Sequence, residues 1–251
     1  DYLTWSLYYR RLAQNPNYYN MTGASHRHIS DHLSELVENT LADLEQGKVL
    51  AIEDDMDLAA LNLGMVASYY YVAYTTIELF SSSLQPRTKI KGLLEILAAA
   101  SEFDVLPLRP GEEVAVERMI KHAPVAVSQP RFNDPHTKVN ALLQAHFSRT
   151  PLVGDLGLDQ SAVVGQCVRL LGALVDVVAS QSWLAPALAA MEMSQMVTQG
   201  LWDKDSPLLQ LPHITADMAV AAEGAGVSSV YDLLDMDDEP RRALLVVHVQ
   251  Q

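Results

Sequence analysis

Long apolar segments with helical spacing dominate the middle of the chain and constrain its fold more than any other feature. Between residues 61 and 202, apolar side chains recur every three or four positions, which is typical of helices that bury one side. We expect no strand in this region. The sequence therefore predicts a bundle of about six helices, over residues 63–84, 88–103, 111–122, 136–148, 159–180 and 186–202.

The first sixty residues follow a different pattern. A helix is predicted over residues 2–15 and ends before Pro16, because a proline disfavours the helical region for the residue before it. Ser25 is a suitable N-cap for a second helix that runs to residue 46. Strand candidates over 48–53 and 57–61 would form a small hairpin. Two helices followed by a hairpin are the outline of the later part of a winged-helix domain.

The last part of the chain is smaller and also reads as helical. Thr215 is a candidate N-cap for a helix over 216–223, and Ser228 or Ser229 would open a second short helix over 230–234. An acidic loop is expected over 235–240, and the apolar stretch 241–247 has no clear assignment. The overall prediction is a mainly α fold.

The negative charge of the chain is unevenly distributed. The formal net charge is −14, which argues against a general nucleic-acid binder, since such proteins use Lys and Arg to neutralise phosphates. Residues 1–60 and 203–251 each carry a net charge of −6, and residues 61–202 carry −2. The middle is therefore where an anionic strand would be least repelled. The acidic ends are better suited to solvent or to protein partners.

The sequence lacks the motifs of common enzymes and metal sites. It has no glycine-rich phosphate loop, no nucleophile elbow and no zinc-protease motif. The single Cys167 excludes a disulfide framework and multi-cysteine metal sites. His28 and His32 lie four residues apart, but two imidazoles without a third ligand make a weak site. We therefore expect no catalytic residue, metal or cofactor here.

Two polar stripes are the main candidates for binding. On the helix predicted over 159–180, the polar side chains Gln166, Arg169, Asp176 and Ser180 share one narrow face. On the next helix, Gln195, Gln199 and Trp202 form a similar line. Such stripes could track a single strand by stacking and phosphate contact. A solvent-facing seam or an internal polar network would give the same pattern.

Basic residues gather in two short clusters. Arg10 and Arg11 lie on the first predicted helix, and Arg87, Lys89 and Lys91 follow Pro86. Contact with phosphate or with an acidic protein is one interpretation, and ordinary surface charge is the other. No uninterrupted apolar run approaches the roughly 18 residues of a membrane span, so we expect no membrane partner.

Several strings in the chain resemble a known family. They include Tyr-Leu-Thr-Trp and Gln-Asn-Pro-Asn-Tyr-Tyr-Asn near the start, His-Leu-Ser-Glu-Leu-Val-Glu at 32–38, and Leu-Leu-Gln-Ala-His at 142–146. Together they resemble the Ski-two-like DExH-box RNA helicase family of the spliceosomal U5 particle, over about residues 1–240. Ser-Ser-Leu-Gln-Pro-Arg-Thr-Lys at 82–89 and Gly-Leu-Trp-Asp-Lys-Asp-Ser at 200–206 point to the second, C-terminal helicase cassette.

The resemblance implies a domain organisation. Residues 1–60 would be the end of a winged-helix domain, 61–206 the helical bundle of a Sec63 homology unit, and 207–251 its helix-loop-helix domain. The family's RecA-like ATPase domains, which bind ATP and Mg, lie upstream of this region. The chain also opens without an initiator Met, so we expect it to be a segment of a larger protein.

The resemblance departs from the family pattern at two places. The first hairpin of the last domain reads Leu211-Pro212-His213-Ile214-Thr215, without the glycines whose amides would face a phosphate. Phosphate binding there is therefore not expected. Residues 243–251 also follow the family poorly.

The predicted function is that of a non-catalytic accessory segment of a nuclear, spliceosomal, ATP-dependent RNA helicase. The segment would serve as a regulatory and protein-docking platform, with the parent's RecA-like domains and other spliceosomal proteins as partners. One alternative is a ratchet module that guides single-stranded RNA past either striped helix. Another is a free-standing helical interaction protein.

Overall fold

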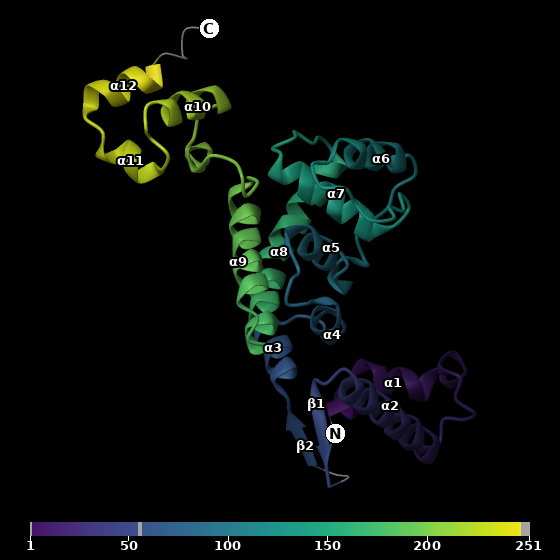
Figure 1. Ribbon diagram of the computed structural model, residues 1–251. Helices are drawn as coiled ribbons and strands as arrows, with labels where there is room; N and C mark the ends of the chain where they lie inside the picture. Colours follow the sequence, from purple (N-terminus) through teal and green to yellow (C-terminus); the bar gives the residue numbers. More distant parts are fainter. Residues whose placement is uncertain (1, 55–56, 247–251) are drawn as a thin grey trace. The chain divides into compact units, whose positions relative to one another are not determined.

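The computed structural model describes residues 2–54 and 57–246, and the chain divides into two compact units, residues 1–67 and 68–251 (Figure 1). The boundary between the units falls within helix α3 (Asn62–Tyr70). The fold is mainly α, as predicted, and the two strands found among the described residues both lie in the first unit.

The first unit begins with a short 3-10 helix and a separate α-helix rather than with one continuous helix. Its elements are η1 (Tyr2–Trp5), α1 (Leu7–Gln14), η2 (Pro16–Tyr19), α2 (His26–Gln46), β1 (Leu50–Glu53) and β2 (Asp57–Ala60). The expected helix over 2–15 is wrong at its start, because Ser6 is extended and caps α1 with its side chain. Pro16 then opens the 3-10 helix η2.

The long helix and the hairpin of the first unit follow the prediction. Ser25 is extended, and its hydroxyl accepts a hydrogen bond from the backbone N–H of His28, as an N-cap should. Strands β1 and β2 pair antiparallel with Leu50 opposite Ala60. Three buried side chains, Leu12, Met21 and Ile29, form the unit's own apolar cluster.

The bundle of the second unit contains more helices than expected. It comprises the end of α3, then α4 (Tyr74–Ser83), α5 (Ile90–Ala98), η3 (Ser101–Phe103), α6 (Glu112–His122), α7 (Pro135–Phe147), α8 (Asp155–Ser180) and α9 (Leu184–Gln199). Helices α8 and α9 lie side by side, and α8 also packs against α4 and α7 (Figure 1). Helix α8 is therefore central in the bundle.

The predicted helix over 63–84 is wrong, because the chain breaks between α3 and α4. Tyr71 has a positive φ of 52°, which ends α3. Glu102 then caps α4 from η3: one carboxylate oxygen accepts the Ala73 N–H at 2.8 Å, and the other accepts the Thr76 hydroxyl at 2.6 Å. A cap supplied by a residue that is distant in sequence cannot be read from local periodicity.

Other helix ends also differ from the prediction. The helix expected over 88–103 stops at Ala98, and the buried, extended Ala100 leads into η3. Helix α8 begins at Asp155 rather than Asp159, directly after Gly154 at φ 62°. Helix α9 ends at Gln199, because Gly200 adopts the left-handed conformation at its C-cap.

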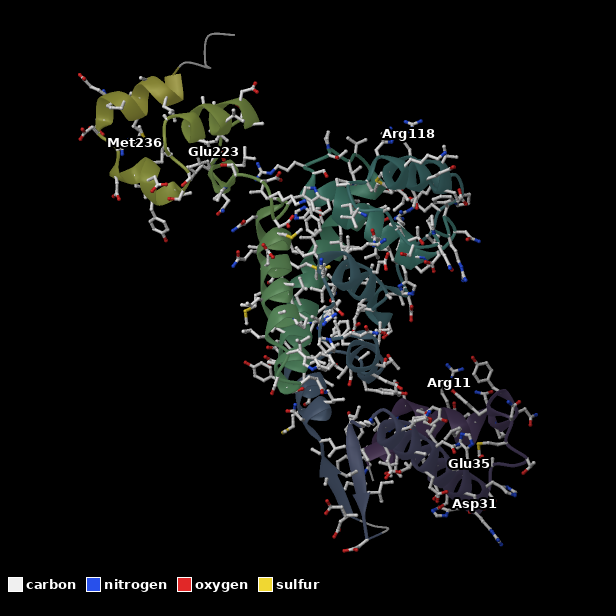
Figure 2. The ribbon with its side chains drawn as sticks, viewed as in Figure 1. Arg11, Asp31, Glu35, Arg118, Glu223 and Met236 are labelled. Carbon is white, nitrogen blue, oxygen red and sulfur yellow. The ribbon has the colours of Figure 1, made fainter. Side chains whose placement is uncertain are left out.

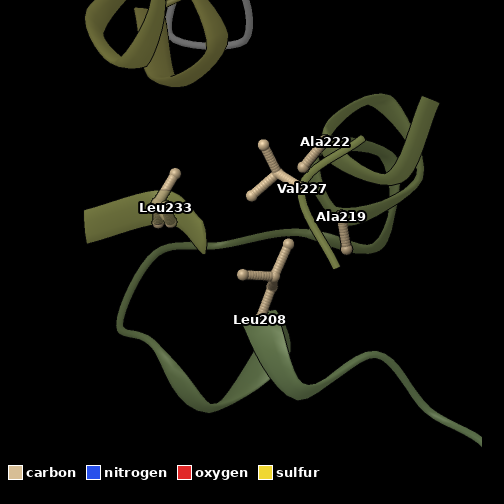
Figure 3. Close-up of a cluster of buried hydrophobic side chains, with 5 residues drawn as sticks. All are labelled: Leu208, Ala219, Ala222, Val227 and Leu233. Atoms are coloured by element: carbon tan, nitrogen blue, oxygen red, sulfur yellow. The ribbon is translucent and has the colours of Figure 1, made fainter. Parts of the chain in front are cut away.

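The last part of the second unit has a small apolar cluster. It contains η4 (Pro207–Gln210), α10 (Ala216–Gly224), α11 (Val230–Asp235) and α12 (Asp238–Val246). The buried members of the cluster are Leu208, Ala219, Ala222, Val227 and Leu233 (Figure 3).

The caps of this last part settle the alternatives that the sequence left open. Thr215 caps α10, and Ser229, rather than Ser228, caps α11 in a reciprocal box with Asp232. The acidic loop expected over 235–240 is wrong, because α12 begins inside it. The undecided stretch continues α12 to Val246, and residue 247 lies outside the described residues. The predicted domain boundaries at 60 and 206 stay predictions.

Candidate partner-binding groove on the bundle

A shallow groove of about 360 Å³ runs between α8 and α9. Its lining is apolar and uncharged polar apart from one carboxylate, and consists of Tyr70, Val168, Leu171, Gly172, Val175, Asp176, Met191, Ser194, Gln195, Thr198 and Gln199. The antiparallel pairing of two long helices, one of them central, creates this groove. Neither Lys nor Arg contributes to the described lining.

Tyr70 lies over α8 at one part of the groove. Its hydroxyl donates a hydrogen bond to the Asp176 carboxylate at 2.8 Å. The ring passes so close to Gly172 that a Cβ there would lie 2.7 Å from a ring carbon. Any side chain at position 172 would therefore force the ring to shift. Burial, reinforced by the hydrogen bond to Asp176, raises the pKa of Tyr70 to about 12.

The predicted stripe residues separate into different surroundings. Gln195 and Gln199 both line the groove. Gln166 and Arg169 lie next to each other on α8, where the guanidinium donates to the Gln166 amide oxygen at 2.6 Å. Asp176 belongs to the groove through Tyr70. The stripe on α8 is thus partly engaged within the protein, and no described ion pair involves Arg169.

Trp202 does not continue the line of Gln195 and Gln199. Helix α9 has already ended at Gln199, so the helical spacing that grouped the three residues does not apply. The indole N–H instead donates to the Ser148 hydroxyl at 2.9 Å, and the ring packs edge-to-face on Phe147. The structure therefore places Trp202 against the end of α7.

Arg10 and Arg11 lie on α1 in the first unit. Arg10 is exposed, and the Arg11 guanidinium lies 5.6 Å from the centre of the Tyr18 ring, within cation–π range (Figure 2). Two of the nearby histidines have partners as well. His32 is 3.0 Å from the Tyr8 hydroxyl, and His28 is 3.0 Å from the Ser25 hydroxyl. No group of three metal-ligand side chains occurs among the described residues.

A buried charge cluster, which the sequence analysis missed, holds the start of α8. The side chain of Lys138 on α7 is fully buried, and its ammonium contacts Glu112 at 2.6 Å and Asp159 at 2.7 Å. Arg109 contacts the same two carboxylates at 2.8 Å and 2.6 Å. Glu112 lies in the first turn of α6, and its contact with Lys138 joins α6 to α7. The shared partners tie three helices together.

The cluster keeps both carboxylates ionised. Hydrogen bonding from Arg109 lowers the pKa of Asp159 against the opposing effect of burial. For Glu112, burial acts to raise the pKa, but the hydrogen bonds from Lys138 and Arg109 outweigh it and lower the pKa overall. A signal was present in the sequence: Lys138 lies in the fourth position of α7, near the start of a helix, where the helix dipole disfavours a cation and acidic partners would offset it.

One helix among the residues described, α8, is long and apolar enough to cross a membrane by length and composition. The central helix of a bundle meets the same test, and α8 packs against α4, α7 and α9. Our expectation of no membrane partner rested on the absence of an uninterrupted apolar run, which is a narrower criterion, and it stays a prediction.

On the same helix, burial raises the pKa of Cys167 to about 12, so its thiol is protonated at neutral pH.

Comparison with known proteins agrees with this architecture. Residues 60–237 match the Sec63 Brl domain family, and residues 1–54 match a winged helix-turn-helix domain family. The chain is 59% identical over 248 residues to the DExH-box ATP-dependent RNA helicase DExH12 of Arabidopsis thaliana. It is 55% identical over 245 residues to the U5 small nuclear ribonucleoprotein 200 kDa helicase of Homo sapiens. Each match covers 98% of this chain.

The chain belongs to the Sec63 Brl domain family. The resemblance to the U5 helicase family is thereby confirmed. The chain spans 11% of the Arabidopsis relative and 12% of the human one.

Proposed function

We propose that this chain is a non-catalytic accessory segment of a spliceosomal ATP-dependent RNA helicase and acts as a regulatory and protein-docking platform. The parent would function in pre-mRNA splicing in the nucleus, by unwinding the paired U4 and U6 RNAs. Its partners would be the parent's RecA-like domains and other spliceosomal proteins. The similarity to named U5 and DExH-box helicases supports the coarse assignment.

The chemistry of the α8–α9 groove is the observation that carries the docking role. An RNA strand needs cations for its phosphates, but the charged group in the groove lining is Asp176. Apolar and amide side chains, by contrast, suit the mixed surface of a protein partner. The groove therefore supports a protein rather than an RNA occupant.

The outer face of α9 extends this surface. Leu184, Leu188 and Met191 follow helical spacing and are 72%, 56% and 48% exposed. The opposite face of α9 is already buried, through Ala190, Met193 and other side chains. One apolar face of α9 packs inside the bundle, so the other apolar face is available to a partner protein. Contiguous exposed apolar side chains are typical of protein interaction sites.

The docking role can be tested in the full-length parent. Leu188→Asp together with Met191→Asp should abolish protein–protein crosslinks to residues 184–199 and leave ATP hydrolysis unchanged. Ala185→Asp, an exposed substitution on another side of α9, is the matched control and should keep the crosslinks. Unchanged crosslinks in the double variant would refute docking at this face.

Guidance of an RNA strand is the second candidate function. Its supporting observation is the pair of Gln166 and Arg169, which carry amide and guanidinium donors on the same helix, α8. Crosslinking of the intact cassette to RNA tests it, and an absence of crosslinks in residues 159–202 would exclude it. Arg169→Glu should also weaken RNA-stimulated ATP hydrolysis if this face contacts the strand.

The ATP and Mg of the proposed activity would be bound by the parent's RecA-like domains. This chain has no glycine-rich phosphate loop in its sequence and no cluster of metal ligands among the residues described. The remaining alternative, a free-standing interaction protein, is tested by sequencing the gene upstream of Asp1. ATPase motifs found there would dispose of it.

A further inference from the structure

A second concave site lies between α6 and α7 and has a different chemistry from the groove. Its volume is about 260 Å³. The lining residues are Arg118, Met119, His122, Ala123, Pro124, Ala141, Gln144, Ala145, Ser148 and Thr150. This volume falls below the range of about 300–1,000 Å³ that is usual for small-molecule sites. It is suited to a single bulky side chain.

Small residues on α7 create the space. Ala141 and Ala145 are buried, and they share a helix face with Gln144 and Ser148. The Gln144 amide is already satisfied: its oxygen accepts the Val125 N–H at 2.9 Å, and its nitrogen donates to the Val125 carbonyl at 2.8 Å. The Gln144 amide therefore needs no hydrogen bond from a ligand. The floor of the pocket is effectively apolar.

The charged side chains of the pocket are cationic or can become so. Arg118 is exposed on α6 and takes part in no ion pair described in this structure (Figure 2). His122 is exposed beside it, and its Nδ1 lies 2.8 Å from the Arg118 carbonyl oxygen. Neither Asp nor Glu occurs in the described lining. The chain as a whole carries a net charge of −14, so the cationic lining of this pocket is opposite in sign to the protein's overall charge.

We propose that this pocket is a docking site for an acidic protein segment, which inserts one aromatic or large aliphatic side chain between α6 and α7 and places a carboxylate against Arg118. A buried apolar anchor with a charged neighbour is a common way in which interfaces concentrate their binding energy. The carboxylate–guanidinium pair would supply orientation and specificity. The site goes beyond the docking role proposed for α8 and α9, because it uses other helices and opposite charge.

The test uses the full parent chain and short displayed peptides as probes. Selected peptides should share one bulky apolar residue flanked by Asp or Glu. Arg118→Glu should weaken their binding at least about tenfold, which is about 1.4 kcal/mol. Thr150→Trp should weaken it similarly by blocking the exposed mouth without touching the core. Arg87→Glu, an exposed arginine outside the pocket, is the matched control and should change affinity less than about twofold.

Several outcomes would overturn the proposal. These are selection of Lys- or Arg-rich peptides, unchanged affinity in both pocket variants, or binding of a single-stranded oligonucleotide that Arg118→Glu abolishes. The variants Leu188→Asp and Met191→Asp should leave peptide binding intact. The experiments can therefore refute either docking site without refuting the other.

Discussion

The two ends of helix α8 are held by different kinds of interaction. At its start, Asp159 belongs to a buried cluster in which Lys138 is fully enclosed and two cations face shared carboxylates. Towards its end, Asp176 is exposed and accepts one hydrogen bond from Tyr70. The first arrangement fixes the start of the helix in the bundle through buried charges, and the loss of one of them would cost much free energy of folding. The second holds the groove end through a single exposed hydrogen bond.

The largest effect is expected from breaking the cluster. Lys138→Met should destabilise the chain by about 3–5 kcal/mol, because it leaves two carboxylates with only Arg109 to compensate them. Urea unfolding of the full chain would measure the loss. Lys121→Met removes an exposed pair with Glu117 and should cost no more than about 1 kcal/mol.

A rescue variant sharpens this result. Lys138→Met combined with Glu112→Gln and Asp159→Asn should recover part of the stability, since it removes the uncompensated charges. If Lys138→Met alone stays within about 1 kcal/mol of the parent sequence, comparable to an exposed pair, the cluster does not fix α8.

Acid should weaken the same end of α8. The pKa values of Glu112 and Asp159 lie below their ordinary values of 4.5 and 3.8 in the folded chain. As the pH falls, these two carboxylates therefore take up protons in the unfolded chain before they do so in the folded chain. The stability that the two groups contribute is lost as the pH falls from about 4.5 through their folded pKa values. Urea unfolding measured across this range should show a steeper loss of stability in the parent sequence than in the triple variant, which keeps other carboxylates such as Asp232. An equal slope in both proteins would contradict the assignment.

At the other end of α8, the close approach of Tyr70 can be tested through two glycines. Gly172→Ala should destabilise the chain by about 1–3 kcal/mol, because the added Cβ would force the ring to shift. Gly165→Ala is the matched control on the same helix, with nothing within 4 Å of the added atom. It should stabilise the chain by about 0.5–1 kcal/mol, as expected for alanine in a helix interior. Equal effects at both positions would show that the ring moves freely.

Periodicity and caps could predict much of the fold, and for clear physical reasons. Ser25, Thr215 and Ser229 cap helices locally, so their roles are encoded within a few residues. The break at Tyr71 could not be predicted in this way, because its stabilising cap comes from Glu102, across the bundle. Apolar patterns specify that a segment is helical better than they specify where it stops.

The candidate sites were predictable only in part. Gln195 and Gln199 share a helix face, and periodicity alone brought them to the groove. Trp202 was grouped with them by a helical spacing that ends at Gly200. The α6–α7 pocket and the Lys138 cluster join side chains from separate helices, so their geometry exists only in the packed bundle.

The smallest effect is expected from the Tyr70–Asp176 hydrogen bond. Tyr70→Phe should cost about 0.5–1.5 kcal/mol at neutral pH, the usual net value of one hydrogen bond. At alkaline pH the sign is opposite to that of the acidic cluster. The folded pKa of Tyr70 is raised from 10.0 to about 12, so the folded chain resists ionisation, and stability falls as the pH rises from about 10 to about 12.

Urea unfolding of the parent sequence and Tyr70→Phe between these pH values would isolate this contribution. The stability of the parent sequence relative to Tyr70→Phe should fall steadily as the pH rises from about 10 to about 12. Tyr231→Phe, at a tyrosine of α11 that is 79% exposed and lies outside the groove lining, is the control and should leave the pH dependence unchanged. Equal stability of the parent sequence and Tyr70→Phe at every pH would show that Tyr70 holds α8 by ring packing on Gly172 alone. The contrast between the two ends of the helix would then be one of packing and charge, without a hydrogen bond at the groove.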